Sequence, residues 1–205
     1  MDLKQKFIQT LQRYLPDDMA NVVAESMIQH NFILKIAKPR DTKLGDFVPP
    51  RQGASCCKIS INCDLKPCHF FAVFLHELAH LYTWKEYGKA VSPHGREWQS
   101  CYHSLLKQYL HIFPESLKSA VLEFCSQPIT ANTTILFDRA LQNGTISTNV
   151  SLILSDLSVG DRFFLLNNPK QFFEVLEKRR TRYVCRDLNT SVQFLIRGLA
   201  EVKKL

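Results

Sequence analysis

The sequence contains no apolar run long enough to cross a membrane. Its longest hydrophobic stretches are interrupted by charged residues or histidines well short of the ~18 residues that indicate a spanning helix. The N-terminal segment MDLKQKFIQTLQRYL also lacks the basic stretch followed by an apolar core that marks a secretory signal. We therefore expect no membrane partner and a cytoplasmic location.

No pair of cysteines has the C-x-x-C spacing of a zinc knuckle. The cysteines number seven, which is odd: Cys56, Cys57, Cys63, Cys68, Cys101, Cys125 and Cys185. In a reducing compartment free thiols behave as small hydrophobic side chains, and we favour this interpretation over a disulfide framework. Cys63 and Cys68 could assist a metal ion, although their spacing does not demand one.

Internal repeats and low-complexity tracts are also absent, and the composition is that of a globular protein. The 205 residues are 45% hydrophobic and 22% charged, which excludes a disordered chain. This length suffices for one sizeable core, or for a core and a small second domain. The formal net charge of +7 favours anionic partners, nucleic acid above all, but many basic proteins bind no nucleic acid.

The first 126 residues predict a domain of the α+β class. Helical spacing and β-rich runs alternate along this part of the chain. The expected helices cover residues 2–14, 16–31, 69–87, 93–111 and 115–125, and the expected strands cover residues 32–36 and 58–62. Residues 39–50 are rich in turn formers, and Gly88 is expected to end the long helix.

The remainder of the chain changes in character twice. Residues 127–150 are rich in Thr, Asn, Ser and Gly, which indicates a linker. Residues 151–205 contain short β-type runs separated by NNPK, KRRT and NTS, which predict a small antiparallel β-meander, SH3-like or a small barrel. The expected organisation is thus a domain over 1–126, a linker over 127–150 and a small β domain over 151–205.

The segment FAVFLHELAHLYTW places His76, Glu77 and His80 inside an otherwise almost entirely apolar run. Positions four apart share one helix face, so both imidazoles can reach one metal ion at ~2.0–2.1 Å. Glu77 projects to the side of that face, as the general base of the H-E-x-x-H pattern does. A buried and unpaired glutamate would cost several kcal/mol, on the order expected for isolated charges, or take up a proton. We therefore favour a metal site over two core histidines beside a capping glutamate.

A catalytic zinc needs three protein ligands and an open position for water. The downstream candidates are His94, Glu97, His103 and His111. His94 is favoured because it stands between Pro93 and Gly95 at a predicted helix start, where a turn can return the chain to the first helix. Glu97 stays open as a thermolysin-like alternative, whereas the two later histidines are expected on helix surfaces or in the core.

With these residues identified, HELAHLYTW followed by SPHGREWQ resembles the SprT-like zinc metalloproteases, which include the Spartan DNA–protein crosslink proteases. The pattern is HExxH, then a distal histidine followed by glycine and, three residues on, an aromatic: His94, Gly95 and Trp98. The upstream segments TKLGDF and KISIN also match, so the resemblance spans residues 16–125. It implies a gluzincin-like fold, with zinc bound by His76, His80 and His94, and Glu77 as the catalytic base.

The sequence departs from many SprT-like proteins in its tail. Only Cys185 follows Cys125, so a cysteine-rich zinc ribbon is not expected, and the β-meander stands in its place. We expect a zinc metallopeptidase acting on protein substrates, with DNA-bound or DNA-crosslinked proteins as the class that the resemblance suggests. The alternative is a non-catalytic metal-containing module that binds nucleic acid or protein, in which Cys63 or Cys68 closes the zinc shell.

Two basic segments raise the question of single-stranded DNA. Basic side chains beside aromatics on a β-scaffold hold phosphates and stack bases in single-strand binders. The tail has Lys178, Arg179, Arg180, Arg182 and Arg186 near Phe172, Phe173 and Tyr183. The alternative is a solvated hairpin whose aromatics lie in the core. A second basic edge is expected beside LGDF, from Lys38, Arg40, Lys43 and Arg51.

Overall fold

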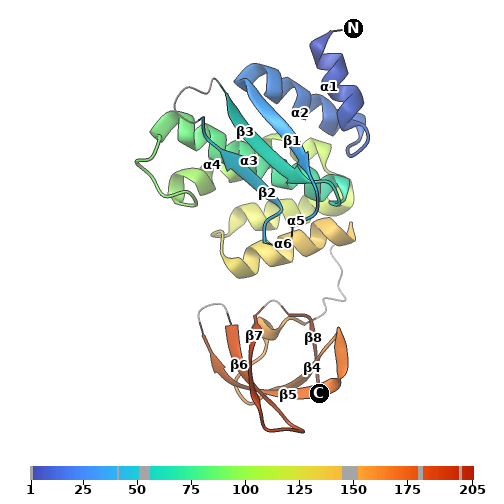
Figure 1. The fold of residues 1–205 in the computed structure, drawn as a ribbon, viewed down its shortest axis with the longest axis vertical. Helices are drawn as coiled ribbons and strands as arrows, with labels where there is room; N and C mark the ends of the chain where they lie inside the picture. The colour runs from blue at the N-terminus through green and yellow to red at the C-terminus, as the bar shows by residue number, and fades with distance from the viewer. Residues whose placement is uncertain (1, 41, 51–55, 145–151, 180–181, 199) are drawn as a thin grey trace. The chain divides into compact units, whose positions relative to one another are not determined.

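The computed structural model divides the chain into two compact units, residues 1–146 and 147–205 (Figure 1). The residues described are 2–40, 42–50, 56–144, 152–179, 182–198 and 200–205. They form a mixture of helices and two β-sheets, which confirms the α+β class. Within these residues no helix is both long and apolar enough to cross a membrane.

In the first unit, helices precede and follow a short sheet along the chain. Its elements are α1 (Leu3–Leu11), α2 (Asp17–His30), β1 (Phe32–Ala37), β2 (Gly45–Val48), β3 (Cys57–Asn62), α3 (Pro67–Tyr87), α4 (Arg96–Gln108), the 3-10 turn η1 (Leu110–Ile112), α5 (Glu115–Ser126) and α6 (Ala131–Asn143). The predicted helices and strands up to residue 126 are all present, with ends displaced by a few residues. Strand β2 was not predicted, because turn-forming residues surround a run of only four.

The three strands pair in the order β1-β3-β2. Strand β1 runs parallel to β3, with Phe32 opposite Cys57, whereas β2 runs antiparallel to β3, with Gly45 opposite Ile61. Strand β2 is therefore an edge of this sheet. Its position matters because it lies against α3, the helix that carries the H-E-x-x-H residues.

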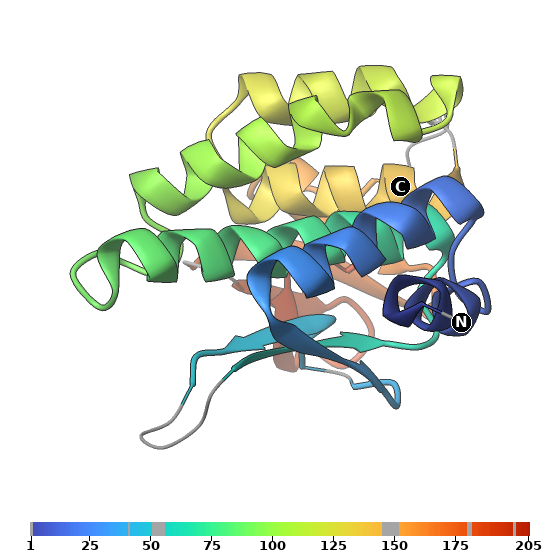
Figure 2. The same ribbon diagram turned by 90° about the horizontal axis from the view of Figure 1, so that it is seen from above.

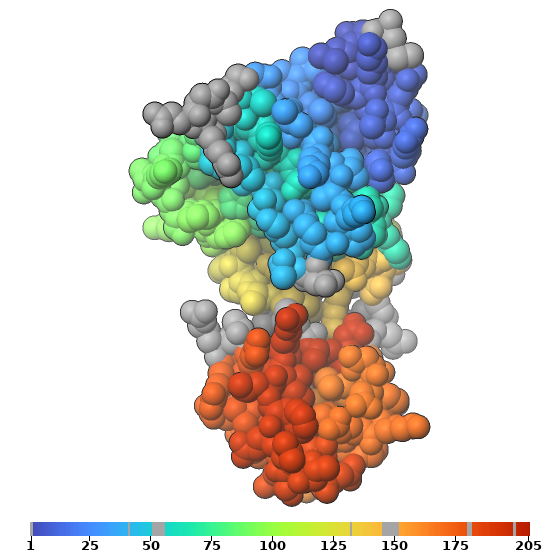
Figure 3. Space-filling view, viewed as in Figure 1, coloured from blue at the N-terminus to red at the C-terminus, as the bar shows by residue number. Residues whose placement is uncertain are grey.

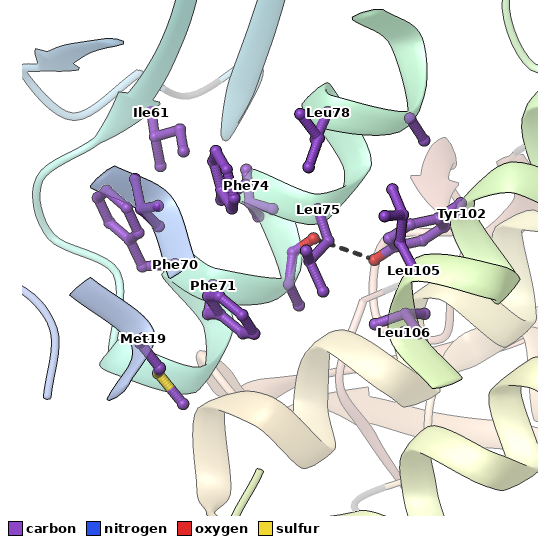
Figure 4. Close-up of a cluster of buried hydrophobic side chains, with 14 of the residues drawn as sticks. Met19, Ile61, Phe70, Phe71, Phe74, Leu75, Leu78, Tyr102, Leu105 and Leu106 are labelled. Atoms are coloured by element: carbon purple, nitrogen blue, oxygen red, sulfur yellow. Dashed lines mark hydrogen bonds between the residues drawn. The ribbon is translucent and has the colours of Figure 1, made fainter. Parts of the chain in front are cut away.

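Helix α3 runs through the middle of the first unit, between the sheet and helices α4 and α6 (Figure 2). A helix that is apolar on all sides is a buried helix, and most of α3 has this composition. Its fully buried side chains include Phe70, Phe71, Phe74, Leu75 and Leu78 (Figure 4). The polar residues of its motif are consequently held in a packed, water-poor setting.

Both ends of α3 have a local cause. Pro67 occupies the first turn, where its missing N–H is not needed. Gly88 adopts a φ of +58° and its N–H donates to the Trp84 carbonyl at 2.8 Å. The positive φ, which glycine adopts without steric cost, ends the helix as predicted, and the chain turns back to bring residue 94 over α3.

The linker expected over 127–150 differs from the structure. Residues Ala131–Asn143 form α6, which begins with a capping box between Thr130 and Thr133. Phe137 and Leu141 of this helix are buried in the core of the first unit. The Thr and Asn residues that suggested a linker lie at the start of the helix, and residues 145–150 of the expected linker lie outside the described residues.

The second unit is a small antiparallel sheet, in which the expected β-meander is found. Its elements are the 3-10 turn η2 (Leu154–Asp156), β4 (Arg162–Leu165), β5 (Asn168–Lys178), β6 (Arg182–Asp187), β7 (Gln193–Arg197) and β8 (Val202–Lys204). The strand order is β7-β6-β5-β4-β8. Leu154, Phe163, Val175 and Cys185 are fully buried in a core of its own. Figure 3 shows its atoms, coloured orange to red, as a continuous packed body.

Candidate metal centre and its cleft

Three imidazoles converge at the surface of α3. His76 and His80 come from adjacent turns of this helix, and His94 comes from the turn that precedes α4. The Nε2 atoms lie 3.3 Å apart for His76 and His80, 3.1 Å for His80 and His94, and 3.4 Å for His76 and His94. The sequence-predicted ligands are therefore brought together, although they are up to 18 residues apart in the chain.

This triangle of nitrogens fits a tetrahedral metal ion. Two metal–nitrogen bonds of 2.0–2.1 Å at a tetrahedral angle separate the nitrogens by about 3.3 Å, which matches the three distances. Without an ion, three mutually adjacent Nε2 atoms cannot all pair donor with acceptor, because each neutral ring nitrogen is one or the other. A cation at the centre satisfies the three lone pairs together.

The imidazoles are held in the neutral form that binds metals. Burial, and then the neighbouring His80, lowers the pKa of His76 to about 3. Burial and His94 lower the pKa of His80 to about 4, and burial also lowers the pKa of His94. All three rings are therefore unprotonated near neutral pH, with lone pairs available for a metal ion.

The buried ring of Trp98 packs against all three imidazoles. This side chain is 1% exposed, and its ring centroid lies 4.6 Å from those of His76 and His94 and 5.1 Å from that of His80. Its Nε1 donates to the His76 carbonyl at 3.4 Å. The aromatic residue of the SPHGREWQ segment thus fixes the ring planes by packing.

Glu77 lies beside the triangle and is buried, with 5% of its surface exposed. Burial, and then the nearby Asp46, raises the pKa of its carboxyl to about 8. The Phe47 backbone N–H donates to the carboxylate, and this bond and the charges of Arg40 and Lys43 oppose the shift. A cation nearby favours the ionised carboxylate in the same way. Strand β2 therefore fixes the direction in which this side chain points.

The glycine of LGDF allows this contact between β2 and α3. A Cβ at position 45 would collide with the Glu77 carboxylate and would lie 2.8 Å from Val73 Cγ1. Real Cβ atoms do not approach other atoms this closely, so only glycine fits here without displacing the side chains of Glu77 and Val73. The sequence indicated turns over residues 39–50, whereas at Gly45 the structure shows close packing of a strand against the candidate base.

Arg40 and Asn62 fasten the segment that leads into β2, a role that sequence reasoning missed. The Arg40 guanidinium donates to Asn62 Oδ1 at 2.7 Å and to Ser60 Oγ at 3.1 Å. Asn62, only 2% exposed, donates to the Lys43 carbonyl at 3.1 Å. The sequence signal that could have revealed this role is the polar residue at the end of the apolar strand KISIN, Asn62. Arg40 thus holds the wall of the site in place and does not form part of an open basic edge. Of the other residues expected at that edge, Lys43 pairs with Asp46 at 2.9 Å. Arg51 lies outside the described residues.

The histidines open into a cleft of about 910 Å³. One wall is the β2 segment, and the opposite wall belongs to helices α4, α5 and α6. The residues of these walls include Leu44, Phe47, Tyr102, Phe124, Phe137 and Asp138, and Trp84 of α3 and Val91 of the following segment also line the cleft. Helix α6, expected as a linker, therefore completes the cleft.

The other candidate ligands lie apart from the triangle. Across the residues described, His76, His80 and His94 form the only group of three or more His, Cys, Asp or Glu ligand atoms close enough to share an ion, within 4.8 Å of one another. His103 packs against Phe124 and His111 is exposed. The cysteines, Cys63 and Cys68 among them, are free thiols as expected.

Metal analysis of the purified chain tests the triangle. We expect about one zinc ion per chain, bound at least 100-fold more weakly when His76 or His94 is replaced by alanine, because two imidazoles remain. The exposed His111→Ala variant is the matched control and should keep the ion. Equal metal content in all variants would remove these histidines from the site.

Substitution of Gly45 tests the contact between β2 and Glu77. We expect Gly45→Ala to lower the free energy of unfolding of the first unit by about 1–3 kcal/mol, as overpacking does. Urea denaturation can be followed by tryptophan fluorescence, since both tryptophans lie in this unit. In a Glu77→Ala background the cost should fall by about half or more, and an undiminished cost would place the strain elsewhere.

Part of the chain is similar to a known protein family. The model of the SprT-like family matches residues 55–118, less than half of the chain. No curated protein and no solved structure matches it. The matched segment contains β3, α3 and α4, and with them the three histidines, Glu77 and Trp98. The resemblance seen in the sequence is thus confirmed for residues 55–118, which match the SprT-like family model.

Proposed function

We propose that the chain is a zinc-dependent metallopeptidase that hydrolyses peptide bonds in protein substrates. The observation that carries this proposal is the buried Glu77 carboxylate beside three converging imidazoles in an open cleft. His76, His80 and His94 would hold the ion. A bound zinc ion polarises a carbonyl group and lowers the pKa of water towards ~7.

Glu77 is the proposed proton carrier. Its carboxylate is oriented by the Phe47 N–H and backed by Gly45, so it faces the cleft from a fixed position. A carboxylate so placed accepts the proton of the attacking water and returns it to the leaving amine, which contributes a factor of about 10²–10⁴ to the rate. Trp98 keeps the imidazoles in register beside it.

The shape of the cleft supports an extended peptide as the substrate. Strand β2 pairs with β3 on one side only, and its other edge follows the cleft. An exposed strand edge accepts an extended chain by backbone hydrogen bonds. Phe47 and Trp84, whose rings lie 6.3 Å apart, add apolar surface for substrate side chains.

The alternative of a structural metal site finds less support. That site would need a fourth protein ligand, for which Cys63 and Cys68 were the candidates. Neither thiol belongs to the histidine group in the described part of the chain. An open fourth position beside a carboxylate is typical of catalytic zinc sites rather than structural ones.

Within this proposal, the narrower substrate class is proteins bound or crosslinked to DNA, and the proposed location is the cytoplasm. The net charge of +7 supports the association with DNA. The tail gives less support for DNA binding. Phe173 and Tyr183 are buried, so their rings are not available to stack on bases. Arg186 pairs with Glu174, and Arg179 pairs with Glu177. Arg180 lies outside the described residues. Binding of single-stranded DNA therefore enters the experiment as a variable.

The decisive variant is Glu77→Gln, which removes the base and keeps the shape. We expect the zinc-loaded variant to retain its metal and to cleave an unfolded protein such as casein at least 100-fold more slowly. Cleavage is measured by gel and mass spectrometry, with and without single-stranded DNA. Acceleration by DNA would support DNA-bound substrates.

Glu97→Gln is the matched control, since Glu97 is exposed and lies near the site without joining the histidines. It should retain both metal and activity. Full activity of Glu77→Gln would exclude Glu77 as the base, and a wild-type chain that binds zinc without cleaving any protein would favour the non-catalytic module.

A further inference from the structure

The cleft extends past the histidines into a side pocket between α3, α4, α5 and α6. Its walls include Ala72 of α3, Tyr102 of α4, Phe124 of α5 and Phe137 of α6. Figure 4 shows Tyr102 directed toward α3, and its hydroxyl donates to the Ala72 carbonyl at 3.2 Å. Because that hydroxyl is already paired, the pocket wall here is apolar.

The aromatic walls are packed in place. Phe124 and Phe137 are each 4% exposed, and their rings stack with centroids 4.3 Å apart and an interplanar angle of 10°. Tyr102 is 5% exposed and stands edge-on to Phe124 at 6.0 Å. A pocket with such walls accepts a chain of methylene groups.

Asp138 places a carboxylate in this apolar pocket. Its side chain keeps 32% of its surface exposed and lines the cleft. The remaining acidic residues along the cleft are engaged: Asp46 pairs with Lys43, and Glu77 is the proposed base. The charge of Asp138 acts inside the pocket. It is the second-largest cause, behind burial, of the raised pKa of Tyr102.

The carboxylate has acceptor capacity left for a ligand. Within the described residues its one ion-pair contact is with His69, whose Nε2 lies 3.4 Å from Asp138 Oδ1. His69 is 1% exposed, and its Nε2 makes no hydrogen bond in the described structure. A carboxylate whose one ion-pair contact within the described residues is an imidazole can still receive a charged donor.

The position of Asp138 sets the length of that donor. Its contact His69 precedes His76 by seven residues along α3, a rise of about 10 Å. A short side chain of a peptide held over the histidines cannot bridge this distance, whereas a long one ending in a cation can approach it through the apolar walls.

We propose that Asp138 is a specificity-determining residue that selects a lysine or arginine side chain next to the scissile bond of the substrate. The inference rests on the proposed peptidase function and adds a substrate class to it. Helix α6 lies beyond residues 55–118, so the selecting residue lies outside the segment matched by the SprT-like family.

Mass spectrometry of cleavage products tests the selection. The zinc-loaded full chain is incubated with an unfolded protein, and the residues around each cleaved bond are counted. We expect lysine and arginine to be enriched at one position beside the bond. Asp138→Asn should lower the cleavage rate of a lysine peptide about tenfold relative to its norleucine analogue, and Asp138→Lys should favour glutamate at that position. The exposed Glu123→Gln on α5 is the control and should keep the enrichment.

A binding measurement separates this inference from the peptidase proposal. Fluorescence anisotropy with labelled lysine and norleucine peptides is applied to the zinc-loaded Glu77→Gln chain, alone and with Asp138→Asn. Tighter binding of the lysine peptide that disappears with Asp138→Asn supports the selection, even if the wild type cleaves nothing. Equal binding of both peptides, or a preference that survives Asp138→Asn, would overturn it, whatever the outcome of the cleavage assay.

Discussion

The candidate metal centre depends on the convergence of three imidazole nitrogens at distances of 3.1–3.4 Å. The nitrogens of His76 and His80 are brought together by one turn of α3, whereas that of His94 joins them only because α3 ends at residue 87 and the chain turns back toward it. Gly88 supplies the turn through its positive φ, and Trp98 supplies the surface on which the rings rest. The deep burial of α3 makes the arrangement stiff, since the helix cannot shift without disturbing the whole core.

The second constraint is the close approach of β2 to α3. Glu77 is directed by a backbone N–H of an edge strand, and that strand can approach because residue 45 has no side chain. The strand is held in turn by Arg40 and Asn62, which are far from the histidines in the chain. The candidate base, the wall of the cleft and the edge available to a peptide are thus parts of one packed assembly.

Much of this site could be predicted from the sequence, because its signals are local. The spacing of His76 and His80, the apolar context of Glu77 and the turn around His94 are each readable within a few residues. The network of Arg40 and Asn62 could not be predicted, because it links residues 22 positions apart through a strand pairing. Helix α6 was taken for a linker because its polar first turn concealed Phe137 and Leu141, whose burial depends on tertiary packing.

X-ray absorption spectroscopy of the zinc-loaded full chain tests the central claim most directly, because it reports the atoms bound to the ion without an assay of activity. We predict three imidazole nitrogens at about 2.0–2.1 Å from the ion and one further oxygen, with no sulfur. A sulfur ligand at about 2.3 Å, or fewer than three imidazoles, would contradict the triangle of histidines as the metal site.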